Sequence, residues 1–180
     1  WITSSCGAQP KLSQTKIRDK IQQLNLIDLK DDQIAVGKVS FSGQGQAVAE
    51  ASVELTFHLS KSKNGDWNVD SIRMGDRDWV SVKDFQSAMN EVRAQNTRDN
   101  LQKLRQAMEL YREKNGDYPK ADNIVKLTDI LFPVYISEAI RFDGWNHELI
   151  YKSPDHQTWK ISSSGPDGIV GDTDDIVVGP

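Results

Sequence analysis

The sequence predicts an α+β protein in which a long helix joins a small helix-plus-antiparallel-sheet module to a second helix-on-sheet domain. Three features predict this class: apolar residues that alternate along the chain before residue 80, a long helical periodicity over residues 82–115, and short strand-like runs from residue 149 onward. The expected parts are a flexible segment over residues 1–12, the small module over 13–80 and the second domain over 81–180. A chain of 180 residues is long enough for two small domains.

A short helix is expected at the start of the small module. Ser13 is a residue type that commonly caps a helix N-terminus, and Ile17, Ile21 and Leu24 follow at the spacing of one helical face. This apolar stripe is the side that we expect to pack on a sheet.

Three strand-like runs follow, over residues 34–41, 47–59 and 67–74. The run over 47–59 is the clearest because every second residue is apolar. Turns are expected at Gly43-Gln-Gly45 and at Asn64-Gly65-Asp66. A helix followed by such a meander is the pattern of cystatin and NTF2-type folds, in which the helix covers one curved face of a sheet.

The large aromatic residues of this module are expected in its core. Phe57, Trp67 and Trp79 lie on or next to the predicted strands, and large aromatic side chains on a strand face mostly pack against other apolar groups. The alternative is that they line a ligand pocket.

A long helix is expected from Val82 to Asn115. It carries two apolar stripes, the first with Phe85, Met89 and Val92 and the second with Leu101, Leu104, Met108 and Tyr111. Residues 93–100 between them are almost all polar, so we expect each half of the helix to pack on a different module and the middle to be solvated. Gly116 supplies a left-handed stop and Pro119 prevents re-entry into the helix.

The remaining residues predict a small sheet. A short helix is expected over residues 123–131, and strands are expected over 149–151, 159–162 and 176–178. A loop rich in aspartate and glycine joins the last two strands.

Composition and motifs argue against several classes of function. A net charge of −4 and a pI near 5.4 do not favour a nucleic-acid partner. His58, His147 and His156 are isolated in the sequence and form no metal-binding or catalytic spacing. The chain also contains no nucleophile elbow and no phosphate-binding glycine loop. We therefore expect a protein that is not an enzyme.

The aspartate-rich loop is the one segment that indicates chemistry. Carboxylates crowded into a short glycine-rich loop repel one another, and a hard cation such as Ca²⁺ would allow them to converge. Asp167 and Asp175 are the expected carboxylate ligands, with the carbonyl of Ser164 and with Asp172 and Asp174 as variable contributors. The loop does not have the EF-hand pattern. The alternative is a solvated acidic turn without a cation.

The N-terminal segment bears on how the protein is anchored. Cys6 is the only cysteine, so an internal disulfide and a cysteine-based metal site are excluded. Small residues before Cys6 weakly resemble a bacterial lipoprotein cleavage site, and Trp1-Ile2 is compatible with the end of a signal or anchor helix. A membrane or lipid anchor upstream of or at Cys6 is one interpretation; a free thiol on a frayed end is the other.

Four segments follow one another along the second half of the chain: Leu110–Pro119 at the end of the long helix, Asp143–Tyr151, Trp159–Gly168, and the closing Asp174–Ile176. In these landmarks and in their order, residues from about 93 to 178 resemble the G-type major pseudopilin of bacterial type II secretion systems. Four landmarks in the family's order are more specific evidence of the resemblance than any single landmark. The second landmark departs from the family because Gly144, Asn146 and Glu148 replace its usual prolines and second glycine.

The resemblance implies a pilin-like helix on a small antiparallel sheet, closed by a structural Ca²⁺ loop. The family's loop carboxylates fall on Asp167 and Asp175, with Asp174 as the alternative to Asp175 if the register slips, and its first carbonyl ligand falls near Ser164. A pseudopilin begins with an apolar half-helix that anchors it and builds the filament core. Residues 13–80 occupy that place here, so the chain is either a relative tethered in another way or one preceded by an apolar segment.

Two functions remain from the sequence. The first is a non-enzymatic extracytoplasmic component of a type II secretion or type IV pilin-like system, in the periplasm or at the cell surface, which binds Ca²⁺ and other subunits. The second is an anchored surface binding module whose N-terminal α+β domain holds a ligand or a protein partner. A hydrolase has the least support, and a histidine beside a carboxylate in a cleft would reopen it.

Overall fold

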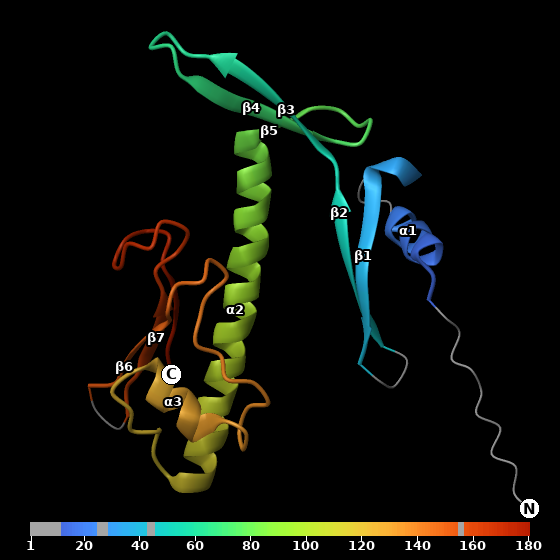
Figure 1. Cartoon of the computed structure of the whole chain (residues 1–180). Coiled ribbons are helices and arrows are strands. Elements are labelled where there is room, and N and C mark those ends of the chain that lie inside the picture. Colours follow the sequence, from blue (N-terminus) through green and yellow to red (C-terminus); the bar gives the residue numbers. More distant parts are fainter. Residues whose placement is uncertain (1–11, 25–28, 43–45, 155–156) are drawn as a thin grey trace, which may run out of the picture. The chain divides into compact units, whose positions relative to one another are not determined.

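The computed structural model describes residues 12–24, 29–42, 46–154 and 157–180. It divides into two compact units, Trp1–Phe85 and Gln86–Pro180, each of which is described by itself. Figure 1 follows the chain through the helices and strands of both units. The expectations for Cys6 and for the Gly43-Gln-Gly45 turn fall outside the described residues.

The first unit begins with a helix packed on a strand. Helix α1, Gln14–Gln23, starts as predicted, because the hydroxyl of Ser13 accepts a hydrogen bond from the backbone N–H of Lys16 at 3.3 Å. A short 3₁₀ helix, Asp31–Gln33, leads into strand β1, Ile34–Phe41. A small core forms between helix and strand from Ile17, Leu29, Ile34 and Val36.

The remaining strands of this unit form two sheets rather than one meander. Strand β2, Ala47–Val53, pairs antiparallel with β1, whereas β3, Leu55–Lys61, β4, Trp67–Met74, and β5, Val80–Ser81, form a separate sheet in the order β3-β4-β5. The predicted single strand over residues 47–59 is therefore wrong, since it is interrupted at Glu54. The N–H of Glu54 bonds the carbonyl of Gln33 at 3.2 Å, and the strand changes its pairing partner there.

The predicted aromatic core of the first unit is also wrong. Phe57 is 48% exposed, Trp67 66% and Trp79 43%. Strand alternation creates an apolar face, but a core needs a second layer above that face. Helix α1 has only 10 residues, and its buried side chain Ile17 lies in the cluster with β1.

Helix α2, Val82–Asn115, has the predicted bounds and continues from the first unit into the second. It ends at Gly116, whose φ of 91° is a left-handed conformation that glycine adopts without strain. Leu101, Leu104 and Met108 of the second stripe are buried as expected.

The first half of α2 departs from the prediction. Met89 and Val92 of the first stripe are exposed, so this stripe is apolar without being buried. Thr97, in the segment predicted to be solvated, is buried, because its hydroxyl accepts a hydrogen bond from the backbone N–H of Gly144 at 2.9 Å. A hydrogen-bonded threonine can be buried at little cost, which a purely apolar pattern does not reveal.

The second unit packs a helix and a sheet against α2. Helix α3, Ile124–Leu131, is capped by Asn123, and strands β6, Ile150–Lys152, β7, Lys160–Ser163, and β8, Ile176–Val178, form an antiparallel sheet in the order β6-β7-β8. The buried core runs from α2 through α3 to β7 and includes Leu104, Leu127 and Ile161. Among the described residues, no helix is both long enough and apolar enough to cross a membrane.

Candidate metal centre

The aspartate-rich loop connects β7 to β8 in the second unit. Gly165, Gly168 and Gly171 have φ values of 65°, 75° and 98°. Side chains other than glycine rarely adopt such values, so these three positions allow the loop to reverse direction repeatedly. The turns fold a short acidic segment back on itself.

Three carboxylates meet inside this loop. Asp167, Asp172 and Asp174 each offer an oxygen atom, and these atoms lie within 4.8 Å of one another. The loop backbone orients two of them. Asp167 accepts a hydrogen bond from the N–H of Ile169 at 2.8 Å, and Asp172 accepts one from the N–H of Asp174 at 3.3 Å.

The third carboxylate is poorly satisfied by the protein. The Oδ1 atom of Asp174 is buried and has no hydrogen-bond partner among the described residues. The pKa of Asp174 is raised from 3.8 to about 6, first because its carboxyl shares a hydrogen bond with Asp172, then through desolvation, and then through the negative charges of Asp167 and Asp172. A hard cation would coordinate the unpaired Oδ1 atom of Asp174 and reduce the repulsion among the three carboxylates.

Close packing holds Asp174 in this place. A Cβ atom on Gly165 would lie 2.8 Å from both the Cγ and the carbonyl oxygen of Asp174, which is closer than real side chains approach. Glycine at this position therefore serves two needs, a positive φ and room for the carboxylate. A residue larger than glycine at position 165 would therefore displace Asp174 from the other carboxylates.

The other predicted ligands lie close by in the chain but outside this triad. Asp175 accepts a hydrogen bond on Oδ2 from the N–H of Gly171 at 2.8 Å, and its Oδ1 is buried without a partner among the described residues. Ser164 is buried directly after β7. The structure therefore groups Asp167 with Asp172 and Asp174, and it places Asp175 beside that group rather than in it.

A buried carboxylate that the sequence did not single out braces the loop. The side chain of Asp143 is fully buried, and its Oδ2 accepts a 2.6 Å hydrogen bond from the hydroxyl of Ser163. Its Oδ1 accepts from the backbone N–H groups of Trp145 and His147 at 3.0 and 2.8 Å. The Ser163 hydroxyl also accepts from the N–H of Gly165 at 3.1 Å, so the bracing reaches the first glycine of the loop.

His147, which is isolated in the sequence, belongs to the same bracing. Its Nδ1 lies 3.0 Å from the carbonyl of Gly165 and 3.6 Å from Oδ2 of Asp143. Because a carbonyl can only accept, the imidazole carries a proton on Nδ1. A side chain on Gly168 would meet the imidazole ring at 3.4 Å, so the ring lies against the loop. The sequence signal was the four-residue spacing of Asp143 and His147 across a turn.

The grouping of Ser163, Asp143 and His147 is not a catalytic triad. Catalysis by serine needs a hydroxyl that donates to histidine and reaches a substrate. Here the hydroxyl of Ser163 donates to Asp143, and Ser163 is fully buried. The histidine beside a carboxylate therefore orients a loop and does not reopen the hydrolase interpretation.

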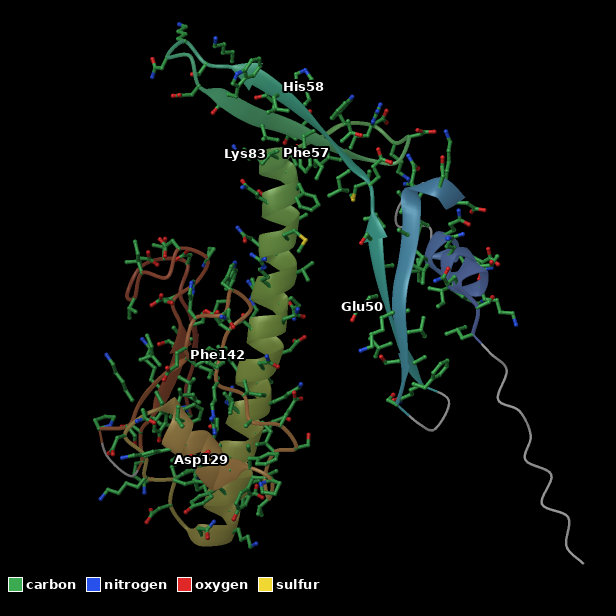
Figure 2. The ribbon with its side chains drawn as sticks, in the orientation of Figure 1. Glu50, Phe57, His58, Lys83, Asp129 and Phe142 are labelled. Atoms are coloured by element: carbon green, nitrogen blue, oxygen red, sulfur yellow. The ribbon has the colours of Figure 1, made fainter. Side chains whose placement is uncertain are left out.

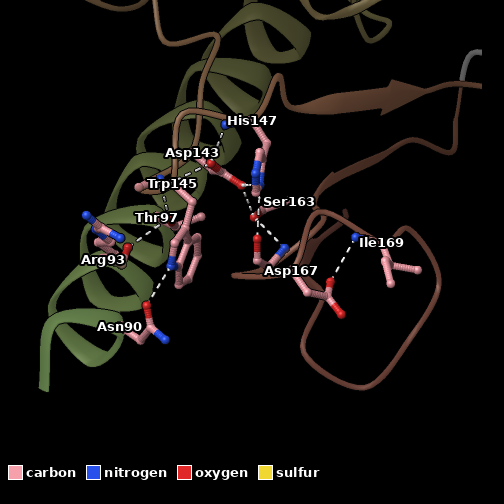
Figure 3. Close-up of polar contacts among 11 residues, drawn as sticks. Asn90, Arg93, Thr97, Asp143, Trp145, His147, Ser163, Asp167 and Ile169 are labelled. Atoms are coloured by element: carbon pink, nitrogen blue, oxygen red, sulfur yellow. Dashed lines mark hydrogen bonds and ion pairs between the residues drawn. The ribbon is translucent and has the colours of Figure 1, made fainter. Parts of the chain in front are cut away.

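The bracing continues to helix α2. The N–H of Gly144 donates to the Thr97 hydroxyl, which donates to the carbonyl of Arg93 at 2.8 Å. The indole Nε1 of Trp145 donates to Asn90 at 2.9 Å (Figure 3). The turn over residues 143–147 therefore connects the acidic loop with one side of α2.

Comparison with known proteins gives one match. The family model described as "Type II secretion system (T2SS), protein G" matches residues 85–179, which is more than half of the chain and includes the acidic loop and the turn that braces it. Neither the curated proteins nor the solved structures contain a match.

Proposed function

The chain belongs to the type II secretion system protein G family, and on this basis we propose that it is an extracytoplasmic, non-enzymatic subunit whose acidic loop binds Ca²⁺. Pseudopilins of this family are generally structural components that act outside the cytoplasm and associate with other secretion subunits. The match covers residues 85–179, so the proposal concerns the second unit first.

The single observation that carries the Ca²⁺ proposal is the convergence of Asp167, Asp172 and Asp174 around a buried oxygen without a partner. All the donors are oxygen atoms, which favours Ca²⁺ or Mg²⁺ over metals that prefer sulfur or imidazole. Ca²⁺ accepts irregular geometry with six to eight oxygens, whereas Mg²⁺ demands a near-ideal octahedron. Carboxylate oxygens that converge from an irregular loop suit the less demanding ion.

The proposed ligands are the triad together with Asp175 and the carbonyl of Ser164. The bound ion would neutralise the carboxylates and hold β7 and β8 at the two ends of the loop. Asp143 and His147 would keep the loop against the turn over residues 143–147, as their hydrogen bonds already do. The role of the ion is therefore structural.

Thermal unfolding of the full chain tests this proposal. A ligand that binds only the folded state, at 100 times its Kd, adds about 2.7 kcal/mol of stability. For a unit of this size we expect Ca²⁺ to raise the Tm by on the order of 10 °C over the value in EDTA. Asp174→Asn should lose most of this increase.

Glu148→Gln is the matched control, because it removes one negative charge from an exposed position of the same unit, outside the loop. It should keep the full response to Ca²⁺. If the Tm of the unchanged protein is the same in EDTA and in saturating Ca²⁺, the loop is only an acidic turn and the metal proposal fails. Family membership does not depend on that result.

The second candidate function, a binding module, draws support from one observation in the first unit. Phe57 and Trp67 are exposed on the β3-β4-β5 sheet, where a self-contained domain would bury them. This surface is compatible with a subunit that also holds a protein partner.

A further inference from the structure

The sheet β3-β4-β5 has one strongly apolar face, which we call the apolar face of the sheet. Pairing places Phe57 opposite Ile72, Leu59 opposite Val69, and Ile72 opposite Val80. Residues directly opposite each other in an antiparallel pair point to the same side, as do alternate residues of β3. A register shift between His58 and Leu59 keeps Val69 and Ile72 of β4 on the same side. The exposed members of this face are Leu55, Phe57, Leu59, Trp67, Val69 and Val80.

The opposite face of the same sheet carries polar side chains, several of which contact one another. Asp70 accepts a hydrogen bond from Ser60 at 2.9 Å and lies 3.4 Å from Nδ1 of His58. The ring of Trp79 stands edge-on to His58 and lies under the guanidinium of Arg73, 4.9 Å from the ring centroid. The polar side chains thus contact one another, whereas within the first unit the apolar face has no second layer over most of its residues. Figure 2 labels Phe57 and His58, neighbouring residues of the two faces.

The apolar face of the sheet contributes little burial to the stability of a monomer. Only Ile72, in the centre of the face, is buried, and the six residues around it are between 38% and 66% exposed. Contiguous apolar surface of this kind marks a site of association. The question is therefore what covers it.

We propose that the apolar face of the sheet packs against the same face of a second copy of the chain. Two sheets pack well face to face when their inner residues are apolar and their outer residues are polar, which is the division between the two faces here. A contact of one surface with itself is two-fold symmetric and closes at a dimer. The face carries one charged residue, Lys61, next to the hairpin turn, where its ammonium group can stay in water.

The exposed area is enough for such a pair. With side chains of 150–250 Å² for the largest residues, the exposed fractions amount to roughly 600 Å² on each copy. Two copies would bury about 1,200 Å², which is the lower end of the range for specific interfaces. The dimer should therefore be reversible and depend on concentration.

A lipid surface fits the face less well. Strand β3 is an edge strand, so the backbone groups along its outer side are not paired within the sheet. Unpaired backbone groups are strongly disfavoured in hydrocarbon, whereas water at the rim of a protein dimer can satisfy them.

Sedimentation equilibrium of the full chain across the micromolar range tests the proposal. We expect a monomer–dimer equilibrium for the unchanged protein. Phe57→Lys should raise the dissociation constant at least tenfold, because the ammonium group would be buried without a partner. Thr56→Lys adds the same charge at the preceding residue, which lies on the polar face, and should leave the dissociation constant unchanged.

The second test position guards against loss of folding. Trp67 is the most exposed residue of the face, so Trp67→Lys should keep the circular dichroism spectrum and the Tm of the unit while weakening the dimer. Its control is Asn68→Lys on the other face. A chain that stays monomeric throughout the concentration range overturns the proposal, as does equal weakening by the variants of both faces. Flotation of a monomeric chain with vesicles of anionic lipid would assign the face to a membrane instead.

Discussion

The two units of the chain use similar apolar content in different ways. In the second unit, helix α2, helix α3 and the sheet β6-β7-β8 contribute to one continuous core that reaches from Leu101 to Ile161. In the first unit the core consists of Ile17, Leu29, Ile34 and Val36, and most of the apolar residues of β3 and β4 are exposed. The number of layers differs: an apolar face becomes a core only when another element covers it.

The largest expected difference concerns one leucine in each unit. Leu104→Ala should lower the free energy of unfolding of the second unit by about 3 kcal/mol, because Leu104 is fully buried and its loss leaves a cavity. Leu59→Ala should cost about 1 kcal/mol or less, because the Leu59 side chain is half exposed. Urea unfolding of the full chain at low protein concentration measures both values. Equal losses would show that the apolar face of the sheet is covered within one chain.

A pair of glycines gives the next largest contrast. A Cβ on Gly144 would overlap the backbone carbonyl of Arg93, which helix α2 holds in place, so Gly144→Ala should cost about 2 kcal/mol. A Cβ on Gly37 of strand β1 would meet the carbonyl of Glu50 at 3.5 Å, an ordinary contact. Gly37→Ala should therefore be neutral or slightly stabilising. The same urea experiment compares the two, and a tolerated Gly144→Ala would mean that the turn is not clamped to α2.

The helices were the most predictable part of the fold because their ends depend on local chemistry. Ser13 and Asn123 cap α1 and α3 through their own side chains, and Gly116 ends α2 through its own backbone angle. Burial on the first unit's strands was not predictable in the same way. The alternation of residues 47–59 shows which side chains share a face, but it carries no information on whether another layer covers that face.

The candidate site was predictable as a loop and less so as a set of ligands. Four aspartates among glycines indicated crowding, and the family resemblance pointed to Asp167 and Asp175. Which carboxylates converge depends on three positive φ angles, and the structure groups Asp167 with Asp172 and Asp174. The four-residue spacing of Asp143 and His147 was the only local signal for the bracing, because the contacts with Ser163 and Gly165 lie about 20 residues further along the chain.

A pH dependence is expected in the second unit, whose acidic loop holds a carboxylate with a raised pKa. The folded-state pKa of Asp174 is raised from 3.8 to about 6, so in EDTA the folded state binds this proton more tightly than the unfolded state does. Its contribution to stability is present below pH 4 and is lost as the pH rises to about 6. Ca²⁺ bound as we propose would compete with the proton, so the increase in Tm on adding Ca²⁺ should grow over the same interval.

Scanning fluorimetry between pH 4 and 7, with EDTA and with Ca²⁺, measures this effect. Asp174→Asn removes the titrating group and should flatten both the slope in EDTA and the growth of the Ca²⁺ response. A Ca²⁺ response of constant size across the interval would mean that Asp174 does not bind the ion.

The smallest expected effect separates apolar burial from surface charge as the reason for the difference between the units. Lys103 of α2 lies 2.8 Å from Glu138, and both side chains are about half exposed. Exposed pairs of this kind contribute about 0.5 kcal/mol or less, so Lys103→Met should change the unfolding midpoint of the second unit very little, and added salt should reduce even that change. A loss comparable to that of Leu104→Ala would attribute the stability of this unit to its charges, whereas the near-neutral result that we expect leaves the covered core as its source.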